Sequence, residues 1–256
     1  MRFSATLLLL AGLLCAPVQA HEAHRKMTAR DIVAKAIEQA GGEAWRGART
    51  MHMKGIATLY RGGTYDKVTE ATRYEMWRVY AAANNNAHQA NGKFRLDSEK
   101  DGHILFQSAF DGQQAYDANG PIANADDGRR DESGAYGFGI IRFALNEGFK
   151  LERLADDQVE GNPAQFVKIT DPTGGVTIFG VDMRDYSIRT VEYDTSRGWH
   201  QRIYSDFETK ANPGFRQATR VRFYYNGVKT VDAKWQTWTV NEPISDTVFE
   251  LKKTAK

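Results

Sequence analysis

The feature that most constrains this chain is a long succession of β-patterned segments, each bounded by turn residues. From residue 50 onward, apolar and polar residues alternate with a period of two, as they do along a strand that buries one face. The turn pairs Asp101-Gly102 and Asn226-Gly227 favour tight hairpins. Many strands at even spacing predict an antiparallel meander that curves into a sandwich or a barrel. The expected strands are 50–60, 67–80, 93–98, 103–110, 114–117, 165–170, 176–182, 187–194, 199–207, 219–225 and 228–240.

Helical spacing occurs in only two places. Residues 28–40 place apolar side chains on one stripe, with Thr28 as the N-cap, Asp31 as its partner three positions on, and Gly41-Gly42 as the end. Residues 136–147 follow a polar loop at 119–134 and are apolar at near-helical spacing. A short helix after a long surface loop is typical of a lid.

The first 20 residues have the layout of a secretory signal peptide. Arg2 precedes an apolar run at 7–15, and small residues lead up to Ala20, where we expect cleavage. The alternative is an uncleaved anchor. Leu14 precedes Cys15, which does not fit the lipidation rule of bacterial lipoproteins, so we interpret Cys15 as an apolar filler. The mature chain would then carry no cysteine, as suits an oxidising export compartment, and we expect a periplasmic protein whose residues 21–27 form a flexible N-terminus.

Composition excludes several broad classes. The 256 residues are 11% aromatic and 26% charged, with a net charge of +2, which argues against a strongly disordered chain. The near-neutral charge gives no support for a nucleic-acid binder. A single cysteine excludes a disulfide framework and a multi-thiolate metal site. No glycine-rich nucleotide-binding pattern lies between a strand and a helix.

Catalytic and metal-binding patterns are weak. None of the six histidines belongs to an H-E-x-x-H pair. His21 and His24 could hold a copper ion with the mature N-terminal amine, although a disordered tail is the alternative. The paired carboxylates 126–127 and 156–157 lie in turn-like, solvated sequence. We therefore expect no enzyme, no metal and no cofactor.

Large side chains fill the expected inward positions of the strands. A sheet lined this way is either a filled core or a cavity for an apolar ligand. Met51 and Met53 suit an adaptable cavity wall, and they suit an ordinary core equally well. The other large inward residues are Trp77, Phe94, Leu96, Ile104, Phe106, Phe110, Phe166, Ile178, Ile203 and Phe223.

Several segments together carry a resemblance to a known family. They are residues 31–37 with Gly41-Gly42, Met53-Lys54-Gly55, 94–97, 110–113, 176–182 with 186–188, and 241–249. Over most of the mature chain, this order resembles the periplasmic lipoprotein-carrier superfamily typified by LolA and LolB, including outer membrane lipoprotein-sorting proteins. The resemblance implies one mainly β (α+β) domain over 28–256. Its fold would be a strongly curved antiparallel sheet, an unclosed half-barrel, with an N-terminal helix and a short lid helix on the concave side.

The resemblance also implies a function and its residues. In that family the concave face holds acyl chains under a helical lid, which here would be Tyr136, Phe138, Ile140, Ile141, Phe143 and Leu145. The cavity would use Met51, Met53 and the other inward residues above except Phe166. We expect a monomeric periplasmic carrier of acyl chains or another apolar small molecule, whose partners include a lipoprotein or a membrane-anchored envelope protein. The alternative is an envelope sensor that contacts a membrane-bound regulator through the loop 125–133, with Arg129-Arg130.

Overall fold

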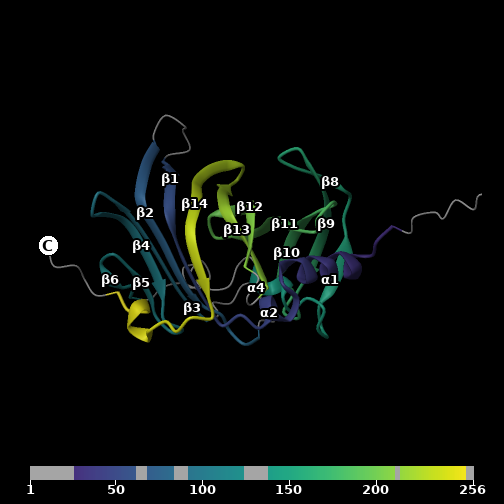
Figure 1. Ribbon diagram of the computed structural model, residues 1–256, viewed down its shortest axis with the longest axis horizontal. Helices are drawn as coiled ribbons and strands as arrows, with labels where there is room; N and C mark the ends of the chain where they lie inside the picture. Colours follow the sequence, from purple (N-terminus) through teal and green to yellow (C-terminus); the bar gives the residue numbers. More distant parts are fainter. Residues whose placement is uncertain (1–25, 62–67, 84–91, 124–137, 211–213, 252–256) are drawn as a thin grey trace, which may run out of the picture.

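The computed structural model describes residues 26–61, 68–83, 92–123, 138–210 and 214–251 (Figure 1). The leader, Cys15, His21 and His24 lie outside the described residues. Tyr136 and the loop 125–133 also lie outside them, so the structure does not bear on those expectations.

One antiparallel sheet, with 14 strands in the described residues, makes up most of the described structure. It runs in the order β6-β5-β4-β3-β2-β1-β14-β13-β12-β11-β10-β9-β7, with β8 paired to β9. The edge strands β6 and β7 do not pair with each other in the described chain, so the sheet is a curved, unclosed half-barrel, and the expected fold class is confirmed. The strands are β1 (Thr50–Tyr60), β2 (Val68–Val79), β3 (Lys93–Lys100), β4 (His103–Phe110), β5 (Ala115–Asp117), β6 (Gly120–Pro121), β7 (Lys150–Arg153), β8 (Asp157–Val159), β9 (Asn162–Thr170), β10 (Val176–Asp182), β11 (Ile188–Thr195), β12 (Gly198–Lys210), β13 (Phe215–Tyr225) and β14 (Val228–Val240).

The first and last strands meet in the middle of the sheet. β1 pairs with β14 from Met51 opposite Val240 to Leu59 opposite Val231. The register shifts at Gly55, where a Cβ atom would lie 2.0 Å from the carbonyl oxygen of Lys234. Only glycine allows this close approach of two backbones. We call the β1–β14 pairing the seam, because it joins the two halves of the sheet.

Turn chemistry and alternation explain most of the strands. Asp101 and Gly102 have φ of 51° and 80°, and Asn226 and Gly227 have φ of 50° and 77°. Positive φ at both central residues is the geometry that these pairs favour, so both predicted hairpins form. In β1 the buried side is the one predicted, with the alternate residues 51, 53, 55, 57 and 59 inside.

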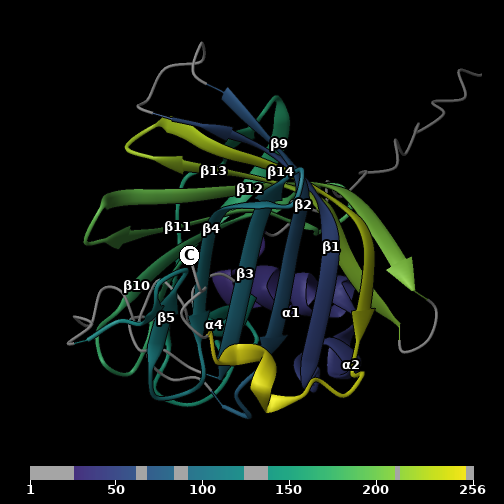
Figure 2. The same ribbon diagram turned by 90° about the vertical axis from the view of Figure 1, so that its left-hand side faces the viewer.

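Helix α1 (Ala29–Ala40) lies on the face of the sheet that we call the inner face. Thr28 and Asp31 form the predicted capping box. Ile32 and Val33 are fully buried in the main core, and α1 packs against β7, β9 and β13. Gly41 ends the helix, and the short α2 (Gly42–Arg46) follows directly, burying Trp45. Figure 2, seen from the side of β1–β4, shows α1 behind these strands.

The second predicted helix is shorter than expected. Of residues 136–147, only α4 (Phe138–Ile141) is helical in the described chain, and turns follow it. Side chains from α1 and α2 donate hydrogen bonds to backbone carbonyl oxygens that would accept from backbone N–H groups in a longer helix. Arg46 Nε donates to the carbonyl oxygen of Arg142, and Arg30 Nη2 donates to that of Leu145. Tertiary contacts therefore replace helical hydrogen bonds there.

The C-terminal segment crosses the opposite face, which we call the outer face. The 3-10 helix η1 (Asp246–Phe249) lies in front of the strands in Figure 2 and contacts β3. Phe249 is fully buried, and Arg95 donates to the carbonyl oxygen of Val248 at 2.8 Å. Both faces of the β1–β4 half therefore carry packed chain. Within the described residues, no helix combines the length and the apolar character that crossing a membrane requires.

Candidate functional site

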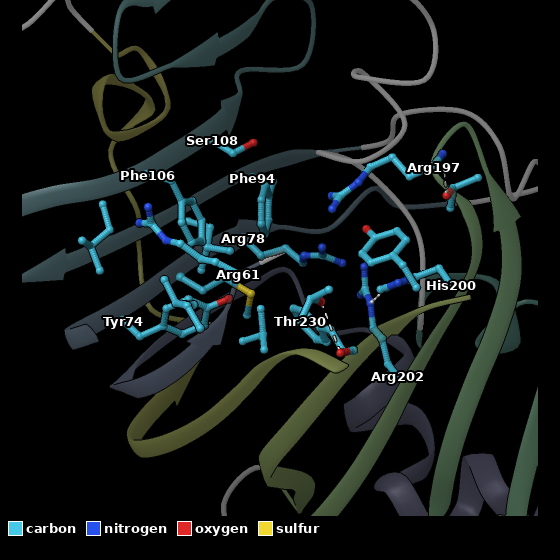
Figure 3. Close-up of a pocket in the computed structure, with 18 of the residues that line it drawn as sticks. Arg61, Tyr74, Arg78, Phe94, Phe106, Ser108, Arg197, His200, Arg202 and Thr230 are labelled. Atoms are coloured by element: carbon cyan, nitrogen blue, oxygen red, sulfur yellow. Dashed lines mark hydrogen bonds between the residues drawn. The ribbon is translucent and has the colours of Figure 1, made fainter. Parts of the chain in front are cut away.

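A cavity of about 530 Å³ lies on the inner face, between the two halves of the sheet (Figure 3). Its volume lies within the range of about 300–1,000 Å³ that is usual for small-molecule sites. We call it the inner cavity. The described residues that line it are Leu59, Arg61, Tyr74, Met76, Arg78, Phe94, Leu96, Leu105, Phe106, Ser108, Tyr193, Thr195, Arg197, His200, Arg202, Phe223, Tyr225, Thr230, Val231 and Trp235.

The two walls of the inner cavity differ in chemistry. The wall from β1 to β4 is mainly apolar and aromatic, with Met76, Leu96 and Phe106 at its centre. The wall from β11 to β13 carries most of the polar groups, including His200 and Arg202. Figure 3 shows this division, with Phe106 and Tyr74 on one side and His200 and Arg202 on the other. The lining thus matches an amphipathic molecule.

His200 fixes the orientation of Arg202. The Nε of Arg202 donates to His200 Nε2 at 3.0 Å, and His200 Nδ1 lies 3.0 Å from the carbonyl oxygen of Tyr224. Because an arginine nitrogen only donates, Nε2 is the accepting atom and the proton sits on Nδ1. Burial, and then the positive charge of Arg202, lower the pKa of His200 to about 3. The imidazole is therefore neutral at physiological pH and orients Arg202 without offsetting its charge.

Arg78 enters the inner cavity from the opposite wall. Its guanidinium lies 5.2 Å from the ring centre of Phe94 and 5.8 Å from that of Tyr80. Its Nε is buried and has no hydrogen-bond partner within the described chain. Burial, and after it the charges of Arg202 and Arg142, lower the pKa of Arg78. This side chain is therefore held in an unfavourable place for a cation.

Two further polar groups lie close to this point. Arg142 is 2% exposed and stacks on the rings of Tyr80, at 4.0 Å, and Trp45, at 4.7 Å. The hydroxyl of Tyr74, on the same strand as Arg78, is buried without a hydrogen-bond partner among the described residues. Buried polar atoms are usually paired in native proteins. The unpaired Nε of Arg78 and hydroxyl of Tyr74 therefore indicate a site in which a polar group of a ligand would supply the missing hydrogen bonds.

Four of the predicted cavity residues line the inner cavity, namely Phe94, Leu96, Phe106 and Phe223. Met51 and Met53 point to the inner face but pack in the main core, where each is at most 2% exposed. Phe110 lies opposite Phe94 and is buried beside the cavity without lining it. Ile104 is 39% exposed near the tip of the β3–β4 hairpin.

Trp77, Ile178, Ile203 and Phe166 belong to the outer face, so their predicted orientation was wrong. Trp77 stacks on His52 and lies under the guanidinium of Arg95, which fills the outer side of β2. Ile203 and Phe166 join a small outer cluster with Val159. Ile178 alternates with the buried Phe179. The outer face has its own apolar contacts, so a large side chain alone does not identify the inner face.

The cavity arginines were not predicted, because the usual pattern places charged residues toward solvent. A signal existed in the alternation itself. In β2, Tyr74 and Met76 share a face with Arg78, and in β12, His200 and Tyr204 share a face with Arg202. Because alternate residues of a strand share a face, one residue known to face inward in each strand would have placed both guanidinium groups on the inner face.

The predicted lid segment lies beside the inner cavity. Ile140 and Ile141 belong to the main core with 2% and 0% exposure, and Leu145 packs against it. Ile140, Ile141, Phe143 and Leu145 do not line the cavity. The guanidinium of Arg142 in this segment lies over the ring of Tyr80, and neither of these two residues lines the cavity.

The described residues bring no three histidine, cysteine or carboxylate side chains together as a metal site would require. The acidic network that the structure does contain is on the outer face. The carboxylate oxygens of Glu75 lie 2.7 Å from His52 Nε2 and 2.5 Å from Arg73 Nη2. These contacts are those of a structural ion-pair network.

Comparison with solved structures places the fold. The chain is similar to an outer membrane lipoprotein-sorting protein domain from Vibrio parahaemolyticus, at 11% identity and a TM-score of 0.50, covering 85% of this chain and 97% of that one. A DUF1329 family protein from Desulfovibrio piger matches at 11% identity and a TM-score of 0.50, covering 88% and 98%. A LolA superfamily protein from Nitrosomonas europaea matches at 10% identity and a TM-score of 0.50, covering 88% and 98%.

These likenesses concern the fold. No protein-family model and no curated protein sequence matches the chain. The chain therefore has a LolA-like fold, as the resemblance in the sequence implied.

Proposed function

We propose that this protein is a periplasmic carrier or binding protein for the acyl chains of lipids or lipoproteins. The observation that carries the proposal is the inner cavity, a space of about 530 Å³ with an apolar wall inside a LolA-like half-barrel. Its expected signal peptide would bring it to the periplasm, where lipids in transit need to be shielded from water. It would act by non-covalent binding, without a chemical step.

Burial of hydrocarbon would supply the affinity. Each methylene group moved from water to an apolar wall contributes about 0.8 kcal/mol. Eight such groups along Met76, Leu96 and Phe106 would contribute about 6 kcal/mol before the cost of immobilising the chain is subtracted. This balance suits reversible binding, which a carrier requires.

A substitution that fills the inner cavity tests the proposal. Ser108 lines the cavity on β4, and Ile104 is an exposed residue of the same strand. We expect Ser108→Trp to weaken the binding of a twelve-carbon lipid by tenfold or more, and Ile104→Trp to leave it unchanged. Displacement of the neutral fluorophore N-phenyl-1-naphthylamine measures the affinity, and native mass spectrometry shows any lipid that copurifies. Equal affinity in both variants, or a wild-type protein that binds no lipid, would refute the carrier function.

A further inference from the structure

The inner cavity carries an excess of positive charge. Its described lining includes the four arginines 61, 78, 197 and 202 and no aspartate or glutamate. Figure 3 shows Arg78 from one wall, and Arg197 and Arg202 from the other, pointing into the space between the walls. Arg61 extends in a different direction in the same view. A cavity for purely apolar cargo has no need of converging guanidinium groups.

Among these four arginines, Arg78 has the least compensated positive charge. No carboxylate of the described chain is among the charged groups that act on Arg78, and its buried Nε makes no hydrogen bond there. Its neighbours are two aromatic rings and the like charges of Arg142 and Arg202. Removing a charge from water without a counter-charge is costly, so an anion bound here would be strongly favoured.

Arg202 is prepared for the same anion. His200 accepts a hydrogen bond from its Nε at 3.0 Å, and Tyr204 also hydrogen-bonds the guanidinium, which lies in the lining of the cavity. A guanidinium fixed in this way presents the fork that pairs with a carboxylate or a phosphate. Because His200 stays neutral over the physiological pH range, this preparation does not depend on pH.

We propose that the inner cavity binds an anionic lipid, whose carboxylate or phosphate lies between Arg78 and Arg202 and whose hydrocarbon chain lies along Met76, Leu96 and Phe106. The inference rests on the proposed carrier function and adds the chemistry of the head group. Arg78 on β2 and Arg202 on β12 face each other across the cavity (Figure 3), and Leu96 on β3 and Phe106 on β4 belong to the same wall as Arg78. A neutral lipid would fill the same apolar surface and leave Arg78 without a counter-charge.

Four ligands separate the possibilities, namely laurate, dodecanol, dodecyl phosphate and inorganic phosphate. Laurate and dodecanol have the same chain length and differ in charge. We expect the wild-type protein to bind laurate at least tenfold more tightly than dodecanol, measured by displacement of N-phenyl-1-naphthylamine. Dodecyl phosphate should also bind tightly, whereas inorganic phosphate alone should raise the unfolding temperature far less than dodecyl phosphate does.

Variants of Arg78 connect the preference to this residue. Arg78→Gln should bring the affinities for laurate and dodecanol within threefold of each other, by weakening laurate and leaving dodecanol unchanged. Arg78→Lys keeps the charge and should recover part of the preference. Arg49→Gln removes an equal charge from an exposed site outside the cavity and should have no effect. Without ligand, Arg78→Gln should unfold at or above the wild-type temperature, because it removes an uncompensated buried charge.

The outcomes are distinguishable. Equal wild-type affinities for laurate and dodecanol would overturn the head-group inference and leave the carrier function standing. Binding of neither lipid would overturn both. Inorganic phosphate binding as tightly as dodecyl phosphate would identify a plain anion site and would overturn the inference as well. A laurate preference that survives in Arg78→Gln would show that Arg78 is not the anion's partner.

Discussion

Ile141, the last residue of α4, tests whether the predicted lid segment is part of the core or a movable lid. Its side chain is fully buried among the residues of the main core. Truncating a buried isoleucine to alanine removes its packing and leaves a cavity, at a cost of about 2–5 kcal/mol. For a chain of this length, each kcal/mol lowers the unfolding temperature by about 2–4 °C. We therefore expect Ile141→Ala to unfold about 4–20 °C below the wild type.

Equilibrium unfolding in urea and a thermal melt both measure this loss. The matched control is Ile104→Ala, which makes the same change at a position that is 39% exposed. Exposed substitutions usually change stability by no more than about 0.5 kcal/mol. If Ile141→Ala is as mild as the control, the segment does not contribute to the core, and the assignment made from its burial is wrong. A lid would instead show a small loss of stability together with altered lipid affinity.

Two further predictions concern the sheet itself. Burial raises the pKa of Glu75, but hydrogen bonds from His52 and Arg73 outweigh it, so the pKa is lowered. The ionised carboxylate should therefore contribute about 1–3 kcal/mol to the free energy of unfolding above its unfolded pKa near 4.5, and this contribution is lost as the pH falls through the folded pKa. In urea, Glu75→Gln should be less stable than the wild type at pH 7, and this difference in stability should shrink at pH 3, whereas a difference independent of pH would contradict this origin. Gly55→Ala would bring a Cβ atom 2.0 Å from the carbonyl oxygen of Lys234 and should cost about 1–3 kcal/mol or more by thermal unfolding, and an unchanged melting temperature would show that the seam adjusts freely.

Local signals predicted the elements well. The capping box of Thr28 and Asp31 marks the start of α1, and Asn226-Gly227 marks the β13–β14 hairpin. In each case the residues act through atoms within a few positions of themselves, so the sequence contains the cause. The alternation in β1 was also sufficient, because one side of that strand faces the core and the helices.

Orientation was harder to predict where the sheet has packed chain on both sides. Trp77 was expected on the inner face, but it packs against His52 and Arg95 on the outer face. Its neighbour Arg78 therefore faces the cavity. A shift of one residue inverts every assignment along a strand. The convergence of Arg78 with Arg202 depends on strands more than a hundred residues apart, and no local pattern reports such a meeting.

The seam between β1 and β14 implies an order in which the strand pairs form during folding. Within each half, neighbouring strands are also consecutive in sequence except that β7 pairs with β9, so we expect their pairings to form early. The seam pairs Met51 with Val240, which are distant in sequence, so we expect this pairing to form last. Until it forms, two long strand edges lie open to pairing with other copies of the chain. The walls of the cavity come from both halves, so a lipid captured there stabilises only molecules whose seam has closed.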